Sequence, residues 1–302
     1  MRDRGAPFVL PWSLSQTWEV FERNRIGFAL LSNPVPGMLL RDGPEAVVFA
    51  TEVNEAVTEL VAAHPDRFGL FAALPMPHIQ ESLEQIRYAY EQLGADGVVL
   101  TAQSAGRYLG APEHTEVLAE LDRRQATVLV HPMMLPGAPL DDPPSVLADF
   151  LLDTTRAALN LMLTGTLDRY PQINFILAHA GGFLPYAASR VAALSQQFFG
   201  LPAHRFQSYL HRFYYDLALS APAALPSLLA AVPASRILYG TDWSAAPSGP
   251  VAANTDALDR YPIPPTDRAR IDQENALRIL PRLAQHLATG TGDDDRALAC
   301  TD

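Results

Sequence analysis

Helix-like and strand-like segments alternate along this 302-residue chain, and the alternation constrains the fold more than any other feature. Segments with apolar residues three or four apart indicate helices, and short aliphatic runs between them indicate buried strands. Such alternation favours one parallel sheet wound by right-handed crossovers. The seven predicted strands lie near residues 28–32, 69–74, 97–101, 127–130, 175–178, 213–217 and 236–241. After a first helix that Ser13 can cap, the predicted helices lie near residues 52–64, 79–93, 113–125, 145–164, 184–199, 222–232 and 267–288.

Seven strands are one fewer than a closed (β/α)8 barrel contains. The pattern begins with a helix near residue 13, so we expect the absent strand to be the first one. Phe8, Val9 and Leu10 form a run that is too short and too close to this helix to be predicted as its replacement. The sequence therefore predicts an α/β fold of TIM-barrel type, a (β/α)8 barrel whose first strand is missing or replaced.

Composition limits the partners and the compartment. The net charge is −11, and no cluster of Lys and Arg could follow a phosphate backbone, so we expect no nucleic acid partner. No apolar run approaches the roughly 18 residues of a membrane-spanning helix, and the first residues do not resemble a signal peptide. The one cysteine, Cys300, permits no internal disulfide. We expect a cytoplasmic protein with a single domain over residues 1–288 and a flexible acidic tail over 289–302.

Three predicted strands end in side chains that can do chemistry. The run 127–130 leads to His131, the run 175–178 leads to His179 and two glycines, and the run 236–241 leads to Asp242. The carboxyl ends of parallel strands share one face of a sheet, so these side chains can converge. Alone, each has an ordinary explanation: an Asp can cap a helix, and a His can be a satisfied core residue. Together they favour a metal site, with His131 and Asp242 as ligands and His179 as a third ligand or as a base.

Several ordered motifs resemble the metal-dependent amidohydrolase-related family. They include Val130-His131-Pro132, the stretch from Leu163-Thr164-Gly165 through Tyr170-Pro171 to Pro185, Leu238-Tyr239-Gly240-Thr241-Asp242-Trp243, Asn54-Glu55, His64-Pro65-Asp66-Arg67-Phe68, Gly106-Arg107-Tyr108-Leu109-Gly110 and Glu274-Asn275-Ala276. The similarity runs from about residue 12 to residue 283. Within the family, the sequence resembles the decarboxylase branch typified by aminocarboxymuconate semialdehyde decarboxylase and 6-methylsalicylate decarboxylase.

The resemblance implies a barrel with one divalent metal, most often Zn²⁺, and assigns roles by position. His131 and Asp242 match metal ligands, and His179 matches the histidine that works on the metal-bound water. Arg190 matches an arginine that in some members reaches a neighbouring subunit to hold the substrate carboxylate, so a homodimer is expected. A surface salt bridge is the alternative for Arg190. Arg107 is a further candidate for pairing with the carboxylate.

The sequence departs from the family in one respect. Members carry His-x-His or Glu-x-His on the first strand, which supplies two metal ligands. The eight histidines of this chain are at positions 64, 78, 114, 131, 179, 204, 211 and 286, and no two of them are two apart. Either the start is placed too late or the strand has been lost. With two ligands missing, we expect metal binding to be weak or absent.

The expected activity follows from the resemblance. It is metal-dependent, non-oxidative decarboxylation of a small aromatic or enol-conjugated carboxylic acid. One alternative uses the same groups in a metal-dependent hydrolase of a lactone, ester or amide. A second alternative is a barrel without catalysis that acts as a binding protein, and it follows from the two missing ligands.

Overall fold

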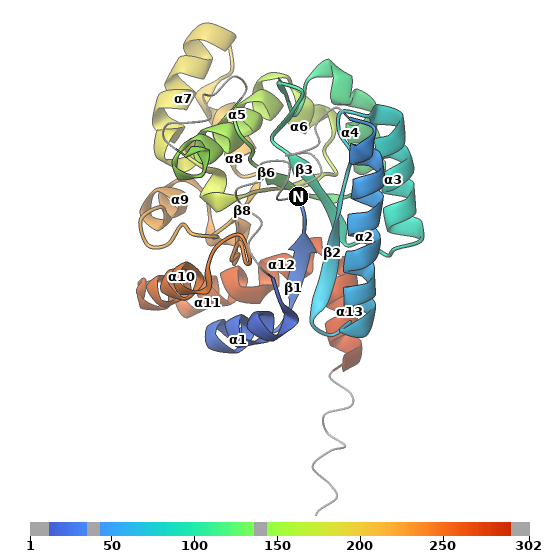
Figure 1. Cartoon of the computed structure of the whole chain (residues 1–302). Coiled ribbons are helices and arrows are strands. Elements are labelled where there is room, and N and C mark those ends of the chain that lie inside the picture. The colour runs from blue at the N-terminus through green and yellow to red at the C-terminus, as the bar shows by residue number, and fades with distance from the viewer. Residues whose placement is uncertain (1–11, 35–42, 136–143, 291–302) are drawn as a thin grey trace, which may run out of the picture.

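We describe the protein from a computed structural model, in which residues 12–34, 43–135 and 144–290 are described. Seven parallel strands form one curled sheet in the order β1-β2-β3-β6-β7-β8-β9 (Figure 1). Their bounds are β1 Ala29–Ser32, β2 Phe68–Ala73, β3 Gly97–Thr101, β6 Thr127–His131, β7 Asn174–Leu177, β8 Tyr214–Asp216 and β9 Ile237–Leu238. The prediction of an α/β fold with seven parallel strands is confirmed. Within the described ranges β1 and β9 are the outer strands, and no pairing joins them.

Helices surround the outside of this sheet (Figure 1). They are α1 Leu14–Asn24, α2 Glu45–Ala63, α3 Ile79–Glu91, α4 Thr115–Arg123, α5 Asp149–Leu163, α6 Thr166–Arg169, α7 Leu184–Phe199, α8 Ala203–Leu210, α9 Leu225–Ala231, α10 Ser248–Arg260, α11 Pro265–Ala269, α12 Asn275–Ile279 and α13 Pro281–Gly290. Ser13 caps α1 as its position suggests, because its hydroxyl accepts the Gln16 N–H at 3.2 Å. None of the described helices is long and apolar enough to cross a membrane.

The sequence patterns miss some helical structure. The helices α8 and α10 and the turn α6 were not predicted, and α2 begins at Glu45 rather than near residue 52. The helix expected over residues 267–288 is interrupted by a π-helical turn, Arg270–Glu274, and again at Leu280. Leu280 leaves the helical region because the ring of Pro281 crowds the residue before it. Of the expected tail, residues 289 and 290 belong to α13, and 291–302 lie outside the described residues, as do Phe8, Val9 and Leu10.

The sheet has an apolar cluster on each side, because side chains alternate in direction along a strand. The outer cluster packs strands against helices and includes Leu70 and Ala72 of β2. The inner cluster fills the concave side of the sheet with alternate residues such as Phe71 and Ala73. The other buried members of the inner cluster are Val99, Ile176, Tyr214, Leu238, Ile279, Leu280 and Leu283. Full burial of one such side chain contributes about 1.5–3 kcal/mol.

The C-terminal helices cover the amino end of the sheet. Ile279 and Leu283 belong to the inner cluster, and the Thr127 hydroxyl at the start of β6 donates to the Ile279 carbonyl at 2.6 Å. The opposite edge, where the strands end, carries loops and an unpredicted hairpin of β4 Gln103–Ser104 and β5 Arg107–Tyr108. A functional site is therefore expected at the carboxyl ends of the strands, because helices cover the amino ends.

Candidate active site

The ends of β6, β7 and β9 bring the three expected side chains together. His131 is the last residue of β6, His179 follows β7 by two residues, and Asp242 follows β9 by four. The ring centroids of His131 and His179 are 5.9 Å apart. Nε2 of His179 lies 3.6 Å from Oδ2 of Asp242. The juxtaposition expected from the strand ends is therefore present in the fold.

The backbone turns sharply where two of these side chains leave their strands. His179 and Asp242 have φ angles of 54° and 58°, in the left-handed region that side chains other than glycine seldom adopt. The chain then turns through Gly181 and Gly182, and a Cβ on Gly182 would collide with the Leu151 carbonyl. The Gly-Gly pair after His179 is thus needed for the close approach of α5, and the turn aims His179 at the mouth of the sheet.

His131 is held as a neutral imidazole with one nitrogen free. Its Nδ1 lies 2.7 Å from the Pro132 carbonyl, which can only accept, so Nδ1 carries the proton and donates. Burial lowers the pKa of His131 to about 4, although the Asp242 carboxylate opposes this change. At neutral pH, Nε2 therefore offers a lone pair.

His179 is held in the opposite electrostatic setting. Burial lowers the pKa of His179. The Asp242 carboxylate and, to a smaller extent, Asp216 raise this pKa, and together they outweigh the effect of burial. The pKa of His179 therefore lies above its ordinary value. The pKa values of the two neighbouring rings are thus shifted in opposite directions.

Asp216 was not singled out from the sequence, and it belongs to the same cluster. It ends β8, and its Oδ1 accepts the Ala218 N–H at 2.7 Å and the His179 N–H at 3.3 Å. The enclosed position of Asp216 raises the pKa of its carboxyl group. A Cβ on Gly240 would approach this carboxylate to 3.0 Å, so the glycine leaves room for it. A carboxylate that ends a predicted strand was the signal that could have identified Asp216.

The two candidate arginines lie apart from this cluster. Arg107 is on β5 with 58% of its side chain exposed, and it pairs with Glu113 at 3.0 Å. Arg190 is exposed on α7. Among the described contacts, neither arginine touches His131, His179 or Asp242. A substrate carboxylate at Arg107 would compete with Glu113 for the guanidinium group, and the exposed side chain of Arg190 is accessible to a neighbouring molecule.

The donor types fit a divalent ion, but the described donor set is small. The free Nε2 of His131 and the carboxylate of Asp242 are donors that Zn²⁺ accepts, and carboxylate oxygen also suits Mn²⁺. In the described ranges, no group of three or more His, Cys, Asp or Glu side chains is arranged to hold a metal ion. The residues present therefore fit as part of a metal site, which needs further ligands.

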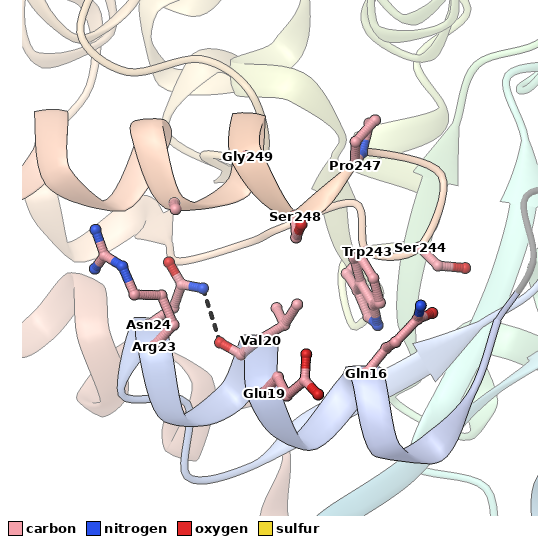
Figure 2. A pocket seen from close by; sticks show the side chains of 11 residues that line it. Gln16, Glu19, Val20, Arg23, Asn24, Trp243, Ser244, Pro247, Ser248 and Gly249 are labelled. Carbon is pink, nitrogen blue, oxygen red and sulfur yellow. Dashed lines mark hydrogen bonds between the residues drawn. The ribbon is translucent and has the colours of Figure 1, made fainter.

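A separate cavity of about 560 Å³ lies between α1 and the start of α10 (Figure 2). Trp243 forms part of its wall, and its indole N–H donates to the Thr17 hydroxyl at 3.0 Å. None of His131, His179 and Asp242 lines this cavity. The cavity is therefore distinct from the cluster of titratable groups.

Comparisons with known proteins found similar sequences and similar structures. The model of the family described as Amidohydrolase matches residues 41–282. A 6-methylsalicylic acid decarboxylase of Penicillium expansum is 31% identical over 286 residues, which cover 91% of this chain and 88% of that protein. A crystal structure described as an amidohydrolase II has a TM-score of 0.83 with 29% identity and covers 90% of both chains.

One further structure extends the likeness in fold. It is a dihydroxybenzoic acid decarboxylase from Polaromonas sp. JS666 with bound manganese and the inhibitor 2-nitroresorcinol. Its TM-score is 0.78 at 23% identity, covering 93% of this chain and 88% of that chain. At this identity the likeness is one of fold alone.

Proposed function

This chain belongs to the amidohydrolase family, and from that premise we propose that it is a carboxy-lyase that removes CO2 from a small aromatic carboxylic acid without oxidation. The observation that carries the proposal is His179, a histidine of raised pKa held 3.6 Å from Asp242 beside the neutral His131. The 6-methylsalicylic acid decarboxylase of Penicillium expansum supports an aromatic acid as the substrate.

The proposed chemical step is a proton transfer from His179. Protonated His179 gives its Nε2 proton to the ring carbon that bears the carboxylate, and this carbon becomes tetrahedral. The bond to the carboxylate then breaks and CO2 leaves. The electron pair of that bond returns to the ring and restores its aromaticity, so a hydrogen has replaced the carboxylate. Asp242 stabilises the imidazolium before the transfer, and Asp216 orients the backbone of His179 through its hydrogen bond.

We propose that His131 and Asp242 would hold a divalent metal, which would supply positive charge to bind and orient the substrate oxygens. Zn²⁺ stays a prediction, and the manganese in the Polaromonas relative makes Mn²⁺ an equal candidate. The small aromatic acid would lie over the three strand ends, where the rings of His131 and Phe150, 6.4 Å apart, form an aromatic wall.

We further propose a homodimer formed through α7. Phe183, Tyr186, Leu194 and Phe198 are large, exposed and spaced so that they share one face of the helix with Arg190. A face with Tyr186 at 83% and Phe198 at 71% exposure is unusual unless another surface covers it. A second copy would cover it and could carry Arg190 towards the partner's site. The single domain over residues 1–288 and the cytoplasmic location stay predictions.

The test is product analysis with metal supplied. The purified chain is incubated with Mn²⁺ or Zn²⁺ and a panel that includes 6-methylsalicylate and 2,6-dihydroxybenzoate, and CO2 and the phenolic product are measured. We expect CO2 release with stoichiometric product from at least one aromatic acid, and its loss in His179→Ala. Turnover of a lactone, ester or amide without CO2 would support the hydrolase. Tight binding of an aromatic acid with no turnover at saturating metal would support the binding protein and contradict the proposal.

The dimer has its own test. Arg190→Ala and His179→Ala should each be inactive alone, and a mixture that exchanges subunits should recover up to about a quarter of the wild-type activity, because some mixed dimers contain one intact site. A monomer in sedimentation, or a mixture that stays inactive after exchange, would contradict the role of Arg190 across the interface.

A further inference from the structure

The helix α5 contains a fully buried carboxylate that the proposed reaction does not use. Asp153 lies on α5 with no exposed surface. Its Oδ2 accepts the Met133 N–H at 2.9 Å, and its Oδ1 makes no hydrogen bond of standard geometry among the described residues. Tyr108 and Arg156 are its polar neighbours, and both lower the pKa of the carboxyl group that burial raises. A buried carboxylate destabilises a fold unless its interactions offset the lost hydration. The position of Asp153 therefore calls for an explanation.

The N–H that Asp153 accepts belongs to the peptide that orients His131. The bond between Pro132 and Met133 is one planar unit, and it is not among the cis peptides of the chain. Its carbonyl accepts the Nδ1 proton of His131 at 2.7 Å, and its N–H donates to Asp153 at 2.9 Å. In a trans peptide these two groups point in opposite directions within one plane. An acceptor on the N–H side therefore sets the direction of the carbonyl on the other side.

We infer that Asp153 is a positioning residue for His131 and that it acts through the Pro132–Met133 peptide. The carboxylate holds the peptide plane, the peptide carbonyl holds the proton on Nδ1, and Nε2 remains the free donor at the mouth of the sheet. The negative charge also polarises the peptide, which strengthens the carbonyl as an acceptor and makes Nε2 more basic. The inference rests on the proposed function in one respect, since Nε2 matters as a metal donor.

Other side chains also contact the loop after His131, but they contact different peptides from the one that Asp153 binds. Gln103 donates to the Met134 carbonyl at 3.2 Å and accepts the Gly106 N–H at 2.9 Å, which joins the loop after His131 to the β4–β5 hairpin. Asn160, two turns after Asp153 on α5, donates to the Leu109 carbonyl at 2.8 Å. Gln103 thus ties the loop after His131 to the hairpin, and Asn160 ties α5 to the residue that follows the hairpin. Of these contacts, only the one to Asp153 reaches the peptide between Pro132 and Met133.

The test compares three variants of the full chain. Asp153→Leu removes the acceptor and the charge, Asp153→Asn keeps an acceptor and removes the charge, and Asn160→Ala is the control that loosens α5 from the hairpin. The first readout is the tautomer of His131 in the metal-free protein, from long-range ¹H–¹⁵N NMR spectra assigned with His131→Asn. The second is the dissociation constant for Mn²⁺ or Zn²⁺, from titration calorimetry or competition with a chelator.

We expect the Nδ1–H tautomer in wild type, Asn160→Ala and Asp153→Asn, and a mixture of tautomers in Asp153→Leu. The metal dissociation constant should rise about 10- to 100-fold in Asp153→Leu, about 3- to 10-fold in Asp153→Asn, and less than twofold in Asn160→Ala. An unchanged tautomer and a change below twofold in folded Asp153→Leu would overturn the inference. If Asp153→Leu does not fold, an unchanged dissociation constant in Asp153→Asn would overturn it.

The readouts also separate this inference from the proposed function. If wild type binds neither ion, the metal-dependent function fails, and the tautomer of His131 in the metal-free variants still decides whether Asp153 positions the ring. If wild type binds metal and releases CO2 while Asp153→Leu matches it in tautomer and affinity, the function stands and the role of Asp153 fails.

Discussion

The two ends of the sheet differ in what the chain places there. At the amino ends of the strands, Ile279 and Leu283 pack into the inner cluster, and a backbone carbonyl of α12 accepts from Thr127. At the carboxyl ends, two histidines and two carboxylates lie close together, and His179 and Asp242 adopt left-handed backbone angles. The first arrangement stabilises the fold. The second lowers stability, because it holds titratable groups close together on a backbone with unfavourable angles. Substitutions at the two ends should therefore separate stability from activity.

The largest effect is expected from His179→Ala at the carboxyl end. Loss of the proton donor should lower kcat about 10³-fold, which is about 4 kcal/mol of transition-state stabilisation. The melting temperature should stay close to that of wild type, and the metal dissociation constant should change less than threefold if His179 is an acid and base rather than a ligand. Steady-state kinetics and calorimetry check this, with His204→Ala on the surface of α8 as the control. A large loss of metal affinity would instead make His179 a ligand.

The matching change at the amino end is Ile279→Ala. Removal of a buried side chain that closes the inner cluster should lower the free energy of unfolding by about 3 kcal/mol. Turnover per folded molecule should not change, because the site is at the other end. Denaturant unfolding and active-site titration measure the two effects. Leu277→Ala, at a half-buried position, is the control with a smaller cost. A loss of turnover comparable to that of His179→Ala would show that the two ends do not separate stability from activity.

Asp153→Asn tests how the buried charge of Asp153 changes the free energy of unfolding as the pH varies. Burial raises the pKa of Asp153 to about 6, against 3.8 for a free carboxyl group. The folded chain then holds this proton more tightly than the unfolded chain, so stability falls as pH rises from about 4 to about 6 and stays lower above that range. The neutral amide removes this dependence.

At pH 7 to 8, Asp153→Asn should therefore be more stable than wild type by about 3 kcal/mol, while the two should converge below about pH 4. Denaturant unfolding across this pH range measures the difference. Asp168→Asn on the surface should have the opposite sign, because its hydrogen bond from Tyr209 and its pair with Arg205 lower the pKa of Asp168. A variant that is less stable than wild type at pH 8 would show that the charge at Asp153 supports the fold.

The smallest effect is expected from Arg107→Ala. Its pair with Glu113 is exposed, so its loss should change the free energy of unfolding by less than about 1 kcal/mol. If Arg107 binds the substrate carboxylate, KM should rise about tenfold with kcat little changed. Arg123→Ala removes a comparable surface pair and should leave KM unchanged. A KM unaffected by Arg107→Ala would leave Arg190 as the candidate.

Patterns in the sequence did not identify functional residues whose hydrogen-bond partners are distant along the chain. Asp153 lies in the predicted helix 145–164, where its helical spacing from Ala157 and Leu161 places it on the buried face. That signal was available, but the partner of Asp153 is a backbone N–H twenty residues away. Asp216 was missed for a related reason, because its importance depends on the backbone of His179 and on the space left by Gly240.

The sequence alone determined the alternation of helices and strands, the parallel sheet and the positions of His131, His179 and Asp242 at strand ends, because hydrophobic period and glycine punctuation are local properties of the chain. The tertiary structure decided the opposite directions in which the pKa values of His131 and His179 move, and it brought Asp153 and Asp216 close to them. Burial, desolvation and hydrogen bonding across strands depend on residues far apart in the chain, so these properties arise only when the sheet curls and brings the ends of its strands together.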